Sequence, residues 1–165
     1  MLFCKTYTFP FNLLITPLYN EIPAISISFM SLLYPLPIII VYQFFLYILT
    51  ENLINFVSFF CFITILITAF NGLLTNNVKS VLGNISVLNL NLIIFLLTYF
   101  DAQVFGFVFF YYSVYIVTSM PFYFFFNFVP VTQLPLFISS FTKSNGYMLV
   151  SFLLSLFYLS GFPIC

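Results

Sequence analysis

The chain has 165 residues and very few charges: three Lys or Arg, three Asp or Glu, no His and no Trp, with a formal net charge of zero. Charged residues make up 4% of it, against about 25% in a typical soluble domain. So few polar groups cannot cover a water-soluble fold, and so few cations cannot neutralise nucleic-acid phosphates. Without histidine the chain also lacks the usual ligand of zinc enzymes and the usual base of hydrolase triads. These absences exclude a soluble domain and a nucleic-acid-binding protein, and they argue against a free-standing enzyme.

Apolar and aromatic residues dominate instead. Hydrophobic residues make up 64% of the chain, aromatic residues 24%, and the mean hydropathy is +1.22. One membrane-spanning helix needs about 20 apolar residues, so about five to six such helices fit if turns take a quarter of the chain. Runs such as 56–70 and 90–100 do not alternate in polarity as barrel strands do. The predicted fold is an all-α integral membrane protein, a single domain over residues 1–165.

Six helical segments are predicted, at residues 2–18, 24–49, 53–74, 81–100, 104–128 and 146–159. Residues 129–145 are predicted to form a loop or a short re-entrant helix. Pro10 interrupts the first segment, and Pro35 and Pro37 interrupt the second. A proline lacks an N–H and frees the carbonyl one turn earlier, which for Pro10 is that of Thr6. A broken helix at membrane depth needs protein or water to satisfy such groups, so the first segment is predicted to be discontinuous.

Polar side chains inside these segments recur at helical spacing. At 100° per residue, positions three, four, seven or eleven apart lie on one helix face. The stripes are Lys5, Thr8 and Asn12; Thr64, Thr68, Asn71 and Thr75; Asn84, Asn91 and Thr98; Tyr111, Tyr115 and Thr118; and Ser31 with Tyr42. One interpretation is that they join neighbouring helices by hydrogen bonds worth about 0.6 kcal/mol each. The other is that several stripes face a common hydrated axis, which would need a titratable group nearby.

The lysines decide between these interpretations. A lysine in mid-membrane costs about 2.5–3.5 kcal/mol and is therefore placed there for function. Lys5 lies near the start of the chain, so its side chain could simply extend to the membrane interface. Two details favour a functional position instead: Lys5 shares a predicted helix face with Thr8, and a proline follows five residues later. Lys79 lies beside a polar loop and Glu21 at a turn, so interfacial positions are expected for both. Pairing of Glu21 with a lysine at a channel mouth stays open.

Three blocks, in order, resemble the antiporter-like subunits of respiratory complex I. Residues 5–12 (KTYTFPFN) resemble the signature K-x-x-x-x-P-F-H, and residues 17–23 resemble the loop P-D-x-Y-E-G-x-P, with Glu21 one place from the usual acid. Residues 71–87 resemble G-x-L-x-Q-x-x-[LI]-[KR]-[KR]-x-L-A-Y-S-S-I, and residues 159–163 (LSGFP) resemble L-[GA]-G-[IL]-P-P. The order and separation of the blocks match those of the family.

The resemblance implies the central part of an antiporter-like helix bundle, with a lysine on a discontinuous helix in mid-membrane. It implies a proton half-channel with Lys5 as the exchanging base, Thr8 and Asn12 ordering water, Pro10 breaking the helix, and Glu21 and Lys79 along the path. It also implies the proton-pumping membrane arm of complex I, without a redox centre, cofactor or metal in this chain. An abundance of residues with A/T-rich codons fits an organelle-encoded protein, so the expected location is the mitochondrial inner membrane.

The resemblance covers the middle of such a subunit. We therefore expect other membrane-arm subunits as partners, together with lipids and with separate polypeptides that supply the missing N- and C-terminal helices. Two departures leave alternatives open. Asn12 stands where the family has a histidine, and near Pro35, where its next lysine falls, only the phenol of Tyr34 is ionisable. The alternatives are a structural scaffold subunit of complex I whose channel has decayed, and a Mrp-type cation/proton antiporter subunit.

Overall fold

The computed structural model describes residues 2–46, 48, 50–99 and 104–128, together with the isolated positions 133, 135, 136, 139, 147, 150 and 153. In chain order the elements are α1 (Leu2–Lys5), the 3-10 helix η1 (Phe11–Leu14), α2 (Ile15–Glu21), α3 (Ala24–Leu32), α4 (Pro35–Leu46), α5 (Glu51–Leu74), α6 (Val78–Tyr99) and α7 (Val104–Phe128). Apart from these helices and their connections, the described residues contain one isolated antiparallel bridge, between Asn77 and Gln133. The chain is all-α, as predicted.

Three helical stretches in the described part are long and apolar enough to cross a membrane: Ile25–Phe45, Glu51–Leu74 and Val78–Thr98. A shorter apolar stretch, Gly106–Pro121, lies within α7. The chain is therefore a membrane-embedded helical protein. Of the predicted five to six helices, the first is divided into short pieces and the fifth contributes only the shorter stretch in α7, so the total number of spans stays a prediction. The predicted loop 129–145 and helix 146–159 lie outside the described residues, apart from the isolated positions above.

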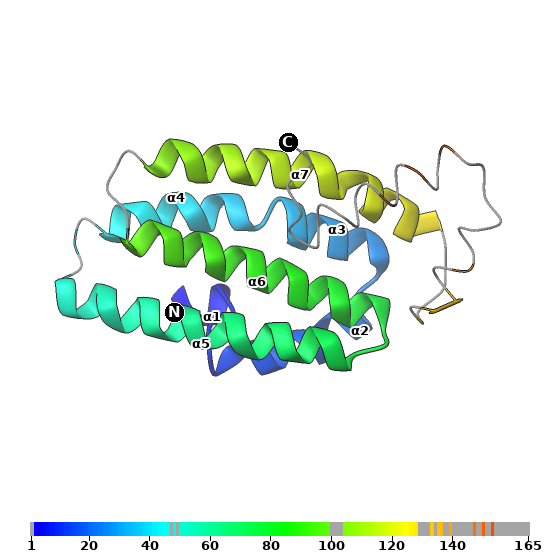
Figure 1. Cartoon of the computed structure of the whole chain (residues 1–165), viewed down its shortest axis with the longest axis horizontal. Coiled ribbons are helices and arrows are strands. Elements are labelled where there is room, and N and C mark those ends of the chain that lie inside the picture. The colour runs from blue at the N-terminus through cyan, green and yellow to red at the C-terminus, as the bar shows by residue number, and fades with distance from the viewer. Residues whose placement is uncertain are drawn as a thin grey trace.

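Helix α6 occupies the centre of the bundle. Figure 1 shows α7, the α3–α4 pair, α6 and α5 running alongside one another, with the short N-terminal pieces against α5 and α6. Helix α6 contacts α2, α3, α4, α5 and α7, and it is the most buried of the three spanning stretches. Asn91 and Ser86, which meet the N-terminal segment from α6, are accordingly buried.

The second predicted helix, 24–49, is divided where its prolines predicted. Helix α3 ends at Leu32 and α4 begins at Pro35. Proline is tolerated at the first position of a helix because the N–H there would have no intrahelical partner. The two helices nevertheless continue along one path in Figure 1, so the interruption is local.

The outer face of α5 is lined by exposed phenylalanines, whereas its inner face carries small and polar residues. Phe56, Phe59, Phe62 and Phe70 are exposed. Ser58, Cys61, Thr64 and Thr68 are buried, and each is three or four residues from the next. Hydrocarbon lipid solvates phenylalanine as well as a protein core does, so in a membrane the apolar face turns outward and the polar stripe packs inward.

Candidate functional site: a helix break held by buried polar side chains

The first helical segment is interrupted between Lys5 and Phe11. Helix α1 ends at Lys5, Tyr7 has a backbone φ of 52°, and the Phe9–Pro10 peptide bond is cis. A positive φ is uncommon for a residue other than glycine and breaks the helical path. The chain resumes as η1, where the Phe11 N–H donates to the Thr8 carbonyl at 2.8 Å. The interruption coincides with the residues that precede Pro10.

A buried amide from α6 satisfies the carbonyl that this interruption frees. The Asn91 side chain donates through Nδ2 to the Thr6 carbonyl at 3.2 Å and to the Val87 carbonyl of its own helix at 2.9 Å. Asn91 and Thr6 are both buried. A protein side chain from a neighbouring helix thus binds the Thr6 carbonyl, the one that Pro10 was predicted to leave without an intrahelical donor.

A hydroxyl from α5 holds the other side of the break. The Phe9 N–H donates to Thr64 Oγ1 at 3.2 Å, and Thr64 in turn donates to the Phe60 carbonyl. Thr68, one turn further along, donates to the Thr64 carbonyl at 2.7 Å. Because α5 and α6 form an antiparallel hairpin in which Gly72 lies opposite Asn84, the residues near 64 and 91 lie at the same depth. The break is therefore clamped from both helices at one level of the bundle.

Several amide atoms around this clamp lack hydrogen-bond partners among the described residues. They are Nδ2 and Oδ1 of Asn12, Nδ2 of Asn84 and Oδ1 of Asn91. Asn12 is only 2% exposed. A buried polar group without a partner costs about 1–3 kcal/mol, a cost that ordered water relieves. Thr8 and Asn12 of the N-terminal segment, Thr64 and Thr68 of α5, and Asn91 of α6 are all buried and are together called the polar layer; Asn84 lies two turns from Asn91 along α6.

The structure separates Lys5 from this polar layer. Thr8 and Asn12 are buried, whereas Lys5 is exposed on the surface of the chain. The expectation that Lys5, Thr8 and Asn12 lie on one helix face is wrong, because α1 ends at Lys5 and the left-handed residue Tyr7 destroys the 100° phase. Pro10 is exposed beside the break. The polar layer therefore contains Thr8 and Asn12 but not Lys5.

Lys79 binds the C-terminal end of α2. Its Nζ donates to the Ile22 carbonyl at 2.9 Å and to the Asn20 carbonyl at 3.4 Å. The last carbonyls of a helix have no intrahelical partner, and a cation there complements the helix dipole. Asn77 and Ser80 add hydrogen bonds to the Asn20 side chain, at 3.0 and 3.2 Å. Lys79 therefore anchors the N-terminal segment to the start of α6.

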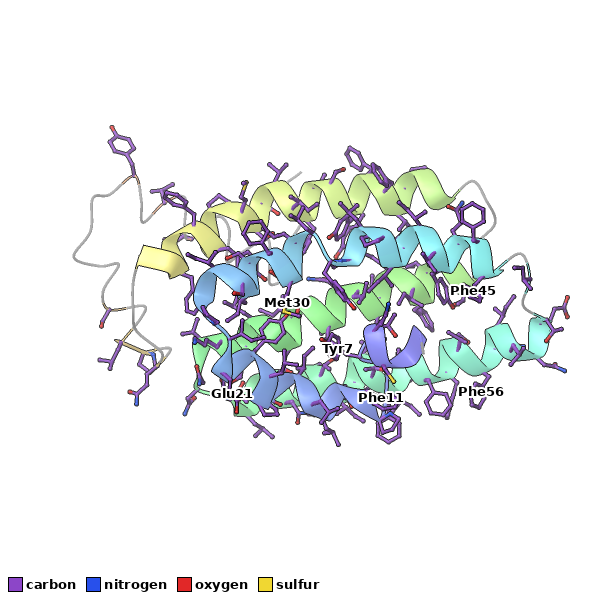
Figure 2. All side chains as sticks on the ribbon, turned by 180° about the vertical axis from the view of Figure 1, so that it is seen from behind. Tyr7, Phe11, Glu21, Met30, Phe45 and Phe56 are labelled. Carbon is purple, nitrogen blue, oxygen red and sulfur yellow. The ribbon has the colours of Figure 1, made fainter. Side chains whose placement is uncertain are left out.

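Glu21 lies at one end of the bundle, away from the helix break. Figure 2 places Glu21 at one end and Tyr7 in the middle of the bundle. The carboxylate is exposed at the last residue of α2. No described contact brings Glu21 to the buried polar layer, so the two parts of the predicted path are not adjacent within this chain.

Sequence reasoning missed one residue that supports the second interruption. The Tyr112 hydroxyl of α7 donates to the Leu32 carbonyl at the end of α3, and both residues are buried. The predicted stripe used Tyr111 and Tyr115 instead. Of these, Tyr111 is half-buried with its hydroxyl 3.3 Å from Asn89 Oδ1. The signal was present, since a helix divided at a proline leaves carbonyls that require donors from a neighbouring helix.

Comparison with protein-family models, with curated proteins and with solved structures finds no match to this chain.

The chemistry of the polar layer is that of neutral amides and hydroxyls. Such groups order water and orient hydrogen bonds, but they do not gain or lose protons near neutral pH. Among the described residues, the charged side chains Lys5, Glu21, Glu51 and Lys79 are exposed or half-buried. A proton that moved through this layer would therefore travel along water and exchange with a charged group at its edge.

Proposed function

We propose that this chain is a component of the proton-pumping membrane arm of respiratory complex I in the mitochondrial inner membrane, and that it resembles subunit 2 among the antiporter-like subunits. It contributes part of a proton half-channel and no redox centre. The sequence support is the three ordered blocks between residues 5 and 163. Its partners in this proposal are the other membrane-arm subunits and lipids.

The structural observation that carries this proposal is the helix interruption inside the first block. The interrupted segment lies against two spanning helices, and the amide of Asn12 is buried there without a partner among the described residues. Asn12 and Thr8 order water at the break. Lys5, at the exposed edge of the same segment, exchanges protons with that water and is covered by the helices that complete the subunit.

The electrostatics of the segment fit this division of roles. The layer itself contains no charged side chain among the described residues, so water there meets no fixed charge that would trap a proton. Glu21 and Lys79 lie at the far end, where Lys79 holds the last turn of α2. A proton on Lys5 is felt by neighbouring subunits through Coulomb interactions, which are strong where water is scarce.

A scaffold role within the same complex is the second candidate, and one contact favours it. Lys79, which the half-channel interpretation places on the path, is engaged with the carbonyls of Asn20 and Ile22 and anchors α2. Asn12 orders water but does not titrate. In this alternative the interrupted helix serves only to pack the N-terminal segment against α5 and α6, and no proton passes through it.

One pair of variants separates the two candidates. Lys5→Met should leave assembly into a large NADH-oxidising membrane complex unchanged and lower the number of protons pumped per electron in proteoliposomes. Full pumping stoichiometry in an assembled complex that carries Lys5→Met would contradict the half-channel role and support the scaffold role. Lys79→Met is the matched control, because it removes a lysine that binds backbone and should affect assembly before it affects pumping. Failure of the chain to co-purify with any NADH-oxidising complex, or sodium-dependent transport by its complex, would contradict both candidates.

A further inference from the structure

A small pocket lies where the two helix interruptions meet. It has a volume of about 20 Å³ open to water-sized molecules and is lined by residues of the N-terminal segment, the α3–α4 junction and α6. Tyr7 and Tyr19 come from the first element, Tyr34 and Pro35 from the second, and Ser86 from the third. In Figure 2, Tyr7 and Met30, which also lines the pocket, both lie in the middle of the bundle.

Hydrogen bonds fix the direction of the donors on one wall. Ser86 Oγ donates its proton to the Gly83 carbonyl at 2.9 Å. Tyr19 Oη lies 3.2 Å from the same Ser86 Oγ. Because a serine hydroxyl has one proton to give, the Tyr19 phenol is the donor in this second bond. The lone pairs of Tyr19 Oη therefore remain available as acceptors.

Two further phenols of the pocket can supply donors. No hydrogen bond joins the phenol of Tyr7 or that of Tyr34 to another described residue. The side chains are only partly buried, and both line the pocket. The lining of the pocket thus includes two phenols that can donate and a third that can accept.

We propose that this pocket is a binding site for one water molecule, which accepts a hydrogen bond from Tyr7 or Tyr34 and donates one to Tyr19. A site for a single water needs about 10–15 Å³ of such volume and two to four polar partners. The pocket meets both requirements. The water joins the two interrupted segments to α6 through side chains, and its presence does not depend on whether the chain moves protons.

Hydroxyl-radical labelling in ¹⁸O-water tests the proposal on the chain in its native membrane complex or in lipid nanodiscs. Tyr19 and Tyr42 form a matched pair, at 3% and 4% exposure, and only Tyr19 lines the pocket. A bound water delivers radicals locally, so Tyr19 should be labelled severalfold faster than Tyr42. Equal rates for the two tyrosines would overturn the proposal, and this comparison needs no variant.

Val87→Ile provides the second arm. Val87 is buried and lines the pocket, so one added methylene takes the space of the water. The labelling of Tyr19 should then fall to the rate of Tyr42. Val108→Ile is the control, since Val108 is buried on α7 and does not line the pocket. Unchanged labelling of Tyr19 in a folded Val87→Ile chain would place the water elsewhere and overturn the site.

Discussion

Two helix interruptions with the same local cause differ in what surrounds them. The first lies between Lys5 and Phe11 and the second between Leu32 and Pro35, each next to a proline. At the first, the freed carbonyl is bound by an amide, Asn91, whose own oxygen has no partner among the described residues. At the second, the carbonyl is bound by a phenol, Tyr112, whose single proton is used in that bond.

A proline therefore does not by itself determine which polar atoms surround a break. A phenol satisfies one carbonyl and presents an aromatic ring to the rest of the interface. An amide satisfies one carbonyl and leaves further donors and acceptors that need water or protein. The partner from the neighbouring helix therefore sets which polar atoms remain for water beside the carbonyl, whereas the proline sets only where the break falls. One turn from Tyr112, Tyr115 also has a buried hydroxyl without a partner among the described residues.

The largest expected effect concerns access of water to the two breaks. In a Cys165→Ser background, native Cys4 reports on the first break and Leu33→Cys on the second, and both positions are exposed. Thiols react as thiolates, which form where water reaches. A charged, water-soluble thiosulfonate should modify Cys4 faster than the cysteine introduced by Leu33→Cys. Buried Cys61 is the internal control and should not react. Equal rates at the two breaks would remove the distinction between them.

The next largest effect is on stability at the first break. Asn91→Leu removes the hydrogen bond that α6 donates to the buried Thr6 carbonyl and the bond to Val87, so unfolding in bicelles should need about 2 kcal/mol less. The matched control is Asn84→Leu on the same helix, because the Asn84 amide nitrogen has no partner to lose. That variant should be neutral or slightly stabilising. Equal destabilisation by both would mean that Asn91 acts through packing.

A smaller effect is expected at the second break. Tyr112→Phe keeps the ring and removes the donor to the Leu32 carbonyl, which should lower the free energy of unfolding by about 1 kcal/mol. The control is Tyr111→Phe. The Tyr111 hydroxyl lies 3.3 Å from the half-buried amide of Asn89, so its removal should lower the free energy of unfolding by less. Hydrogen exchange at residues 33–36 should rise only in Tyr112→Phe. A cost for Tyr112→Phe above that of Asn91→Leu would reverse the ranking of the two breaks.

The smallest effect distinguishes the lysines. Lys79→Met removes the cation at the C-terminal end of α2 and should destabilise the chain by about 0.3–1 kcal/mol, measured by the same unfolding titration. Lys5→Met should leave the free energy of unfolding unchanged, because Lys5 is exposed and ends a short helix. A large loss of stability in Lys5→Met would show that its amine is bound within the chain.

Prediction from sequence succeeded where the helical phase is unbroken. The stripes on α5 and α6 place Thr64, Thr68, Asn84 and Asn91 inward, and all four are buried. Both interruptions also fall where prolines predicted them. The stripe through Lys5, Thr8 and Asn12 failed because it assumed one continuous helix. The roles proposed for Lys5, Glu21 and Lys79 in proton transfer stay predictions.

Composition and proline spacing by themselves determined that this protein is a helical membrane protein with two interrupted segments, because hydropathy and the missing N–H of proline act locally. Only the tertiary structure decided which groups meet at those interruptions. Asn91 and Thr6 are 85 positions apart, and Tyr112 and Leu32 are 80 apart. Pairs so distant depend on how whole helices pack, and that packing assigned the amide to one break and the phenol to the other.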